Sequence, residues 1–319
     1  MKRILTVLAA TLIAGGALAQ AAWPTKPIRM IVPFTAGSVT DIIARTVGES
    51  MSKSLGEPIV IDNKPGAGGT IGAAQVAKSE PDGYTLLIHS SGHALNPAIY
   101  PNLPYDTVRD LTGVTPLASV PNVLVVSPSR GWKSVADLIA AAKAKPGTMN
   151  YASAGTGSAT HMNAEKFKLR AGIDAQHVPF KGTPEALSDV IGGRDDWFFA
   201  PMASALPLIQ SGKLQALAVS SAQRSPALPD VPTTNEAGVA NSDYTLWVGM
   251  IVPSATPPAV VKRLHDEAVK AVSSPEVKAR LAALGADPMP MEPAAFNAYI
   301  RTEMEAAALI AKSANLKAQ

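Results

Sequence analysis

The sequence predicts an α/β fold built from two lobes, with a hinge and an interdomain ligand cleft between them. Strand-like and helix-like stretches alternate along the chain, an order that favours parallel sheets covered by helices. The 319 residues, 47% of them hydrophobic and 17% charged, suffice for two α/β domains of ordinary size. The chain is expected to cross between lobes near residues 120–125 and again near 220–225. Two crossings form a hinge that suits closure around a ligand.

The first residues have the features of a secretory signal. Lys2 and Arg3 precede an apolar stretch from Ile4 to Leu18, and the small residues that follow permit cleavage near Ala19 or Ala21. We therefore assign residues 1–21 to a signal peptide and expect an exported, periplasmic protein. The alternative is a membrane anchor, but the apolar stretch is shorter than the roughly 20 residues that a spanning helix needs.

The composition supports a periplasmic protein. The chain contains no Cys, which excludes lipid attachment through Cys, and an exported chain of this size without disulfides suits a bacterial periplasm. The formal charge is +3 and falls to +1 once Lys2 and Arg3 leave with the signal. A nearly neutral protein gives no indication of binding to nucleic acid or to an anionic membrane.

The first third of the mature chain is expected to form a βαβαβ unit. In the first helix, which starts near Thr40, Ile43, Val47 and Met51 recur every four residues and so share one face. This order predicts a parallel sheet with right-handed crossovers. The predicted strands are 28–32, 59–61 and 84–88, and the predicted helices are the one from Thr40 and one over 71–78.

The rest of the chain continues the alternation. Ser134 and Ser158 are expected to begin helices, and Thr183 is expected to cap a helix with Pro184 at its first position. We assign residues 22–122 and 224–319 to lobe 1 and residues 123–223 to lobe 2. The predicted strands are 123–126, 149–152, 177–180, 214–219 and 246–252, and the last helices are 258–272, 275–284 and 293–311.

Two strand–turn–helix segments, Val32–Asp41 and Tyr151–His161, share one local design. In each, a strand runs into a turn rich in Gly, Ser and Thr, and a helix follows. The first N–H groups of a helix lack intrahelical partners, and the helix dipole adds partial positive charge, so a carboxylate or phosphate suits these positions. One such turn from each lobe, facing across the cleft, would hold an anion from two sides.

Several of these residues have a structural alternative. Asp41 can cap its own helix, which we favour over ligand contact. His161 can donate to an anion or bond a backbone carbonyl. Ser90 and Ser91, at the end of the third strand, can contact the ligand or cap the segment that follows.

Enzyme and cofactor motifs are sparse. The glycine-rich segment 64–72 lacks the Lys and Ser or Thr of a phosphate-binding loop, and Ile71 occupies the third Gly position of a dinucleotide fingerprint, so we interpret it as a structural loop. His89 and His93 are four residues apart, a spacing that suits a metal on a helix, but we expect a strand running into a loop there. Ser153 with His161 is the one nucleophile–base pair considered.

Many short stretches resemble the periplasmic solute-binding proteins of tripartite tricarboxylate transporters, called Bug proteins. The resemblance covers the chain from about Trp23 to the C-terminus. The stretches that carry it are Val32-Pro33-Phe34 with Asp41 and Arg45, Asn63 to Gly69, Pro81-Asp82-Gly83-Tyr84, Asn96-Pro97, Leu103-Pro104-Tyr105-Asp106, Tyr151-Ala152-Ser153, Ser204-Ala205-Leu206-Pro207, Gly212-Lys213-Leu214 and Leu228 to Thr233.

The resemblance implies a type II periplasmic-binding-protein-like fold that holds a carboxylate through two strand–turn–helix units, often with bridging waters and without a metal. Those units fall on Phe34–Asp41 and Ser153–His161. Two features depart from the family. Ala36-Gly37-Ser38 replaces a Pro-Gly-Gly turn, and Ala200-Pro201 replaces an Asp-Asn pair that could hold an amine. We therefore expect plain mono- or dicarboxylates, including aromatic ones, rather than amino acids.

The predicted function is capture of a small carboxylate and its delivery to integral membrane transporter subunits. We expect a monomer with no catalytic residues, no metal, no cofactor and no nucleic-acid partner. The alternatives are a binding subunit of a signalling system and an exported α/β enzyme. The predicted ligand-binding residues are Phe34, Thr35, Ala36, Gly37, Ser38, Thr40, Asp41, Ser90, Ser91, Ser153, Ala154, Gly155, Thr156, Gly157, Ser158, His161 and Ala200.

Overall fold

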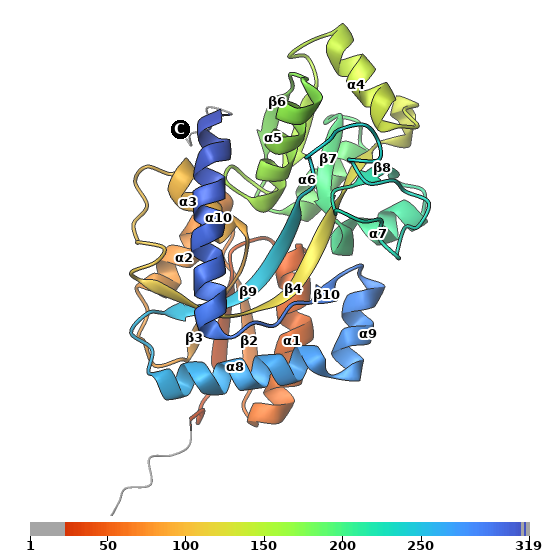
Figure 1. Cartoon of the computed structure of the whole chain (residues 1–319). Coiled ribbons are helices and arrows are strands. Elements are labelled where there is room, and N and C mark those ends of the chain that lie inside the picture. The colour runs from red at the N-terminus through yellow and green to blue at the C-terminus, as the bar shows by residue number, and fades with distance from the viewer. Residues whose placement is uncertain (1–22, 314–315, 317–319) are drawn as a thin grey trace, which may run out of the picture.

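The computed structural model describes residues 23–313 and 316, so the predicted signal peptide and its cleavage sites lie outside the described residues. Figure 1 shows two lobes, one above the other, joined by two long strands. The lower lobe contains β1 (Ile28–Val32), α1 (Val39–Leu55), β2 (Ile59–Asn63), α2 (Thr70–Ala77), β3 (Thr85–Ser90), α3 (Gly92–Ile99), α8 (Pro258–Ser273), α9 (Pro275–Ala283), β10 (Asp287–Pro288) and α10 (Pro293–Ser313).

The upper lobe contains α4 (Val135–Ala144), β5 (Asn150–Ser153), α5 (Ala159–Ala171), β6 (Gln176–Pro179), α6 (Thr183–Ile191), β7 (Trp197–Pro201), α7 (Met202–Gln210) and β8 (Gln215–Val219). The connecting strands are β4 (Leu111–Val126) and β9 (Thr245–Pro253). All strands belong to one sheet with the order β2-β1-β3-β9-β4-β7-β5-β6, in which β8 and β10 also pair with β4.

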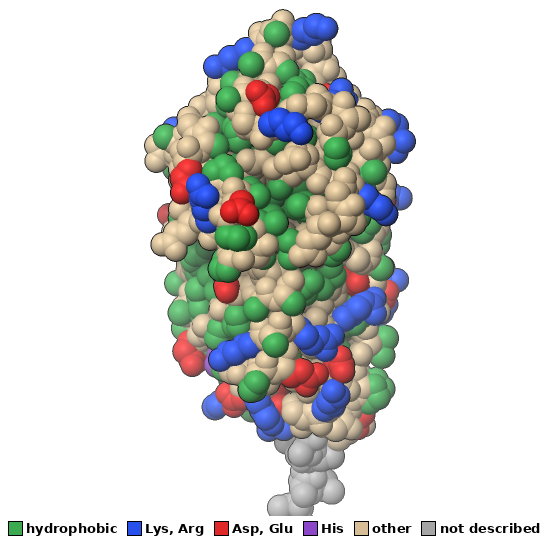
Figure 2. All heavy atoms as spheres, turned by 90° about the vertical axis from the view of Figure 1, so that its right-hand side faces the viewer, with side chains coloured by type: hydrophobic (Ala, Val, Ile, Leu, Met, Phe, Trp, Pro, Cys, Tyr) green, Lys and Arg blue, Asp and Glu red, His purple; other side chains and the backbone are tan. Residues whose placement is uncertain are grey.

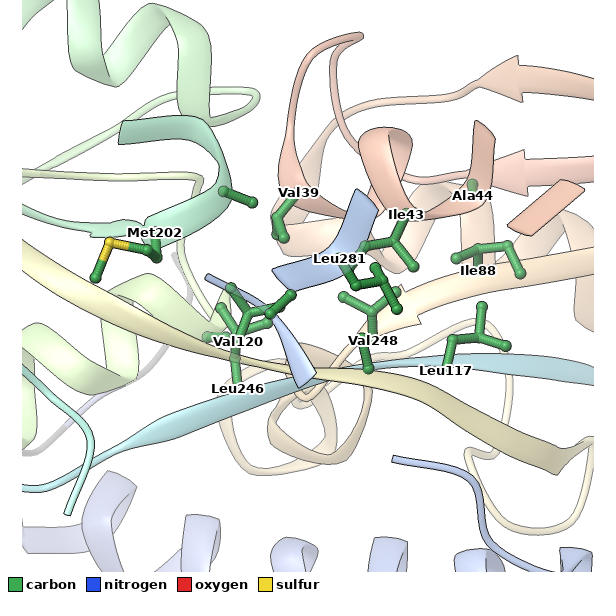
Figure 3. Packing of buried hydrophobic residues seen from close by; sticks show 14 of the residues in the cluster. Val39, Ile43, Ala44, Ile88, Leu117, Val120, Met202, Leu246, Val248 and Leu281 are labelled. Atoms are coloured by element: carbon green, nitrogen blue, oxygen red, sulfur yellow. The ribbon is translucent and has the colours of Figure 1, made fainter. Parts of the chain in front are cut away.

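The first βαβαβ unit forms as predicted. β1 lies between β2 and β3 and pairs in parallel with both, while β9 joins the edge of β3 in the antiparallel sense. On α1, Ile43, Val47 and Met51 are fully buried, so the face predicted from their spacing is the face that packs on the sheet. Figure 3 shows this cluster, in which Leu281 of α9 lies between Ile43 of α1 and Val248 of β9.

The strand predicted at 123–126 is longer than the sequence indicated. β4 begins at Leu111 and runs for 16 residues, pairing first with β9 and then with β7 and β8. Its first part was not predicted because it contains residues that are poor strand formers, namely Gly113, Pro116 and Pro121. Pairing with β9 compensates for them, with register irregularities between Gly113 and Thr115 and between Pro116 and Ala118. Since β4 enters both lobes, it is one of the two connections that can bend.

The segment between β8 and β9 packs on the upper lobe. Thr233 bridges to Val219 of β8, and Val239 is buried in the same apolar cluster as Leu124 and Trp197. The predicted lobe boundaries at 122/123 and 223/224 stay a prediction.

The three helix starts predicted in the upper lobe agree with the structure to within one residue, whereas α7 was not predicted. Ser134 caps α4 in a capping box with Asp137, as its spacing predicted. α6 starts one residue earlier than predicted: Thr183 is its first helical residue and Gly182 is the N-cap. This shift points the Thr183 N–H out of the helix, toward the other lobe.

The sequence analysis was wrong about the segment after β3, where it expected a loop. Residues 92–99 form α3, so His93 lies on a helix and His89 on β3, with their ring centroids 5.6 Å apart. Gly92 and Pro97 reduce the intrinsic helix propensity. The helix forms because Leu95 and Ile99 pack against α10, a contact that no local pattern reveals.

Figure 2 shows the face on the right-hand side of Figure 1, where apolar side chains gather across the middle and charged ones at the lower end. An apolar groove between α6 and α7 is lined by Leu187, Ile191, Pro207 and Leu208. No helix between residues 23 and 313 combines the length and the apolar character that crossing a membrane requires.

Candidate functional site

A small cavity of about 20 Å³ lies where the N-termini of α1, α5 and α6 meet. α1 belongs to the lower lobe and the other two helices to the upper lobe, so the cavity lies between the lobes. This volume is enough for about one water molecule and is far below the 300–1,000 Å³ of typical small-molecule sites, so the lobes must move apart to admit a larger ligand. It is lined by Phe34, Ser38, Val39, Thr40, Ser90, Ala154, Ser158, Ala159, Thr160, Thr183, Pro201 and Leu246.

The lower wall is the turn between β1 and α1. Gly37 has a φ of +83°, a left-handed conformation that favours glycine and turns the chain into the helix. Ser38 is the N-cap of α1, yet its side chain does not cap its own helix. Instead, Ser38 Oγ accepts a hydrogen bond from the Thr183 N–H of α6, at 3.1 Å. The N-cap hydroxyl of one lobe therefore binds the first helical N–H of the other.

Asp41 has the structural role that the sequence analysis favoured. It is 3% exposed and accepts hydrogen bonds from the Gly37 N–H at 3.0 Å, from Arg45 Nε and from Asn63 Nδ2. Burial raises the pKa of Asp41, but the hydrogen bonds from Arg45, Gly37 and Asn63 outweigh it and hold the pKa below its usual value. Asp41 fixes the turn and does not line the cavity.

The upper wall is the turn between β5 and α5. Ser158, the N-cap of α5, accepts from the His161 N–H at 3.3 Å, and Thr160 Oγ1 accepts from the Ala154 N–H at 2.9 Å. Gly155 and Gly157 have φ values of +118° and +77°, which bend the chain between strand and helix. The turn therefore places Ala154, Ser158 and Thr160 on the cavity wall.

Two histidines support this turn from behind. His161 Nδ1 accepts from the Gly157 N–H at 3.2 Å. Ser153 Oγ lies 2.6 Å from His177 Nε2, so the hydrogen-bond partner of Ser153 is His177 rather than the His161 considered from the sequence. The two imidazole rings stack with their centroids 3.9 Å apart. Neither ring lines the cavity.

The lobes also touch on both sides of the cavity. On one side, Thr35 Oγ1 donates to Glu185 of α6 at 2.9 Å. On the other side, the Tyr100 hydroxyl donates to the Thr156 carbonyl at 2.8 Å, and Gly68 lies against the same carbonyl. The described structure is therefore a closed arrangement of the two lobes.

None of the described residues that line the cavity is charged, so helix N-termini and hydroxyl groups provide its polarity. Three helix N-termini direct partial positive charge toward one small volume. The hydroxyl of Thr40 is buried and has no hydrogen-bond partner among the described residues, although buried hydroxyls are usually paired. A small anion that accepts from this hydroxyl and from the helix N–H groups would satisfy both features.

The structure brings part of the predicted site together. The predicted residues that line the cavity are Phe34, Ser38, Thr40, Ser90, Ala154 and Ser158. The remaining predicted residues lie outside its lining: Thr35, Ala36, Gly37, Asp41, Ser91, Ser153, Gly155, Thr156, Gly157, His161 and Ala200. Most of these shape or support the two turns. Ser91 instead bonds the Tyr244 hydroxyl at 3.2 Å.

Six lining residues were missed: Val39, Ala159, Thr160, Thr183, Pro201 and Leu246. Thr183 had a recognisable helix-start signal, which indicates an exposed N–H but not the direction in which it points. Pro201 and Leu246 end or begin strands that only the assembled sheet brings to the cleft.

Comparison with known proteins agrees with this architecture. Residues 43–316 match the tripartite tricarboxylate transporter family receptor model. The chain is 36% identical to protein BugT of Bordetella pertussis over 310 residues, which cover 96% of this chain and 95% of BugT. The structure of the periplasmic binding protein BugD is similar with a TM-score of 0.89 and 33% identity, covering 93% of this chain and 100% of BugD.

A third relative, R. palustris Rpa4515 with adipate, is similar with a TM-score of 0.90 and 34% identity, covering 93% of this chain and 100% of that chain. These likenesses confirm the two-lobed periplasmic-binding fold with an interlobe ligand cleft that the sequence predicted. They also confirm the resemblance noted from the short sequence stretches. This chain belongs to the tripartite tricarboxylate transporter receptor family, and the Bug proteins BugT and BugD are among its relatives.

Proposed function

We propose that this protein is a periplasmic solute-binding protein that captures a small carboxylate in the cavity between its lobes. The ligand is then delivered to the integral membrane subunits of a tripartite tricarboxylate transporter. The observation that carries the proposal is the meeting of α1, α5 and α6 N-termini around the unpartnered Thr40 hydroxyl. A carboxylate complements partial positive charge and hydrogen-bond donors of this kind. Adipate in the structure of a relative supports the same ligand class.

The lining also favours particular carboxylates. Among the described residues, no acidic side chain lines the cavity to hold an ammonium group, and Pro201, the last residue of β7, forms part of the wall. Burial of an unpaired ammonium would be costly. The expected ligands are therefore mono- or dicarboxylates without an amino group, including aromatic ones.

The proposal includes export, a single chain and no catalysis. Export would remove residues 1–21, with cleavage near Ala19 or Ala21. Ser153 is fully buried, and its hydroxyl supports the turn behind the cavity, which gives it no access to a substrate. The lobe boundaries at 122/123 and 223/224 and a monomeric state complete the proposal. Analytical ultracentrifugation of the mature protein measures the last of these.

A thermal-shift screen of the mature protein tests the ligand class. The panel contains mono- and dicarboxylates, the amino acids with matching carbon skeletons, and neutral sugars. Ligands that bind only the folded state raise the melting temperature, by an amount that grows with their concentration relative to Kd. The expected result is a rise with one or a few carboxylates and none with the matching amino acids. A rise with sugars alone, or equal rises for acids and amino acids, would contradict the proposal.

A further inference from the structure

The turn that forms the upper wall of the cavity depends on two imidazole nitrogens that accept hydrogen bonds. The Gly157 N–H can only donate, so His161 Nδ1, 3.2 Å away, must carry a lone pair. The Gly155 N–H donates to Ser153 Oγ at 3.0 Å, and the Ser153 hydroxyl can donate its own proton to His177 Nε2, 2.6 Å away. His161 Nδ1 is therefore unprotonated in the closed structure, and His177 Nε2 is unprotonated in the tautomer that accepts from Ser153.

The surroundings of the two rings keep them neutral. His161 and His177 stack with an interplanar angle of 13°, and Tyr151 stacks on His177 with ring centroids 5.0 Å apart. The charged groups that face the rings are Glu165 and Lys168 of α5. Glu165 already accepts from the Tyr151 hydroxyl and from Lys168, so its charge is engaged elsewhere.

We propose that His161 and His177 are positioning residues of the carboxylate site and that acid releases the ligand by protonating them. The proposal rests on the proposed function, because the turn that they support is the upper wall of the carboxylate cavity. A proton on His161 Nδ1 would turn an acceptor into a donor that faces the Gly157 N–H, and a proton on His177 Nε2 would make the Ser153 hydroxyl turn around and accept. Two stacked cations would also repel each other, at a helix N-terminus that disfavours positive charge.

Protonation of the histidines would change the cavity because the turn between β5 and α5 forms its upper wall. If the Gly157 hydrogen bond breaks and the Ser153 hydroxyl turns around, Ala154 and Ser158 lose the conformation that places them on the cavity wall. The Tyr100–Thr156 contact between the lobes depends on the same turn. Protonation therefore weakens both the wall of the site and one of the contacts that close the lobes.

The direction of the titration agrees with this geometry. Burial and then Lys168 lower the pKa of His161 to about 4, and burial and then His161 lower the pKa of His177 to about 3. When the turn opens, each pKa moves back toward the ordinary value of about 6.5. The open state then binds protons that the closed state excludes, so carboxylate affinity should fall as the pH drops below about 6.5.

The test replaces both histidines with acceptors that do not titrate. In H161N the amide oxygen can take the place of Nδ1, and in H177Q it can take the place of Nε2. Calorimetry uses whichever of adipate, malate and benzoate gives the largest thermal shift at pH 7.5. Wild-type affinity should fall by about tenfold or more between pH 7.5 and 5.0, and that of H161N/H177Q by less than about threefold. Parallel profiles in the two proteins would overturn the proposal.

A matched variant and a second measurement complete the test. His265 lies on α8 and bonds the Met291 carbonyl, so H265Q should keep the wild-type pH profile. In the unliganded protein, the amide resonances of Gly155 and Gly157 should shift between pH 7.5 and 5.0 in the wild type and stay in place in H161N/H177Q. The single variants answer the same question if the double variant does not fold. If no probe binds at pH 7.5, the proposed function fails, while the resonances still decide the inference.

Discussion

The amide N–H of Thr183 donates a hydrogen bond to Ser38 Oγ at 3.1 Å, although the two residues are 145 positions apart. Ser38 is the N-cap of α1 but does not cap it through its side chain, so this hydroxyl serves the contact between lobes. Ser38→Ala should weaken carboxylate binding by about 1–2 kcal/mol, because the Thr183 N–H then has no acceptor when the lobes close. Isothermal titration calorimetry with the best carboxylate of the screen measures the change, which corresponds to roughly five- to thirtyfold in Kd.

Ser134→Ala is the control for Ser38→Ala. Ser134 caps α4 in a capping box far from the cavity lining, so its loss should cost about 1 kcal/mol of unfolding free energy without changing affinity. Ser38→Ala should show the opposite pattern, with stability nearly unchanged. Equal losses of stability in the two variants would mean that Ser38 acts as an ordinary helix cap.

The unpartnered hydroxyl of Thr40 gives the most direct test of the anion site. Thr40→Val keeps the shape of the side chain and removes the donor. We expect carboxylate affinity to fall about tenfold or more, and the unliganded protein to be as stable as the wild type or slightly more stable, since a buried unpaired hydroxyl is lost.

Thr46→Val, on the same helix, is the matched control. Thr46 Oγ1 donates to the Ile42 carbonyl at 2.8 Å and does not line the cavity. This variant should leave affinity unchanged. If Thr40→Val and Thr46→Val bind carboxylates with the same affinity as the wild type, the Thr40 hydroxyl is not a ligand contact.

Gly68 should be required for closure of the lobes. A Cβ added at Gly68 would lie 2.1 Å from the Thr156 carbonyl oxygen in the upper lobe. Because this neighbour is backbone, Gly68→Ala should hold the lobes apart and reduce affinity by about tenfold or more. Small-angle scattering with saturating carboxylate should show a larger radius of gyration than for the wild type.

Gly131→Ala separates this steric effect from backbone strain. Gly131 also has a positive φ, of +74°, but a Cβ there meets nothing within 4 Å. Both variants should lose about 1 kcal/mol of stability from the strained backbone. Only Gly68→Ala should change the scattering profile, and a compact liganded Gly68→Ala protein would contradict the prediction.

Asp41 should matter for stability more than for direct ligand contact. Asp41→Asn places amide protons against the donors of Gly37 and Arg45, so the unfolding free energy at pH 7 should fall by about 1–3 kcal/mol in urea titrations. The pKa of Asp41 is held below 3.8, so its contribution is complete above that pH and is lost as the pH falls through the folded-state value.

Two comparisons check the role of Asp41. The difference between wild type and Asp41→Asn should shrink in acid, as the wild-type carboxylate becomes protonated. Asp266→Asn, in an exposed pair with Lys262 on α8, should leave the unfolding free energy nearly unchanged. A loss of stability that is the same at pH 7 and at pH 3 would show that charge is not the cause.

Local sequence signals predicted most of the secondary structure and the kind of site. Apolar spacing along α1, the capping box of Ser134 and the glycines at 37, 155 and 157 act within a few residues, so their effects are visible in the chain. The same local signals predicted two helix N-termini suited to an anion. These signals could not identify the other half of the residues that line the cavity.

Tertiary structure decided which groups meet. The sheet brings Leu246 and Pro201 to the cleft, packing against α10 makes a helix of residues 92–99, and closure joins Thr183 to Ser38. Ser153 pairs with His177 because β5 and β6 lie side by side in register. Each of these contacts joins residues that local periodicity treats as independent. These contacts stabilise the protein only when burial of the shared core holds the elements together.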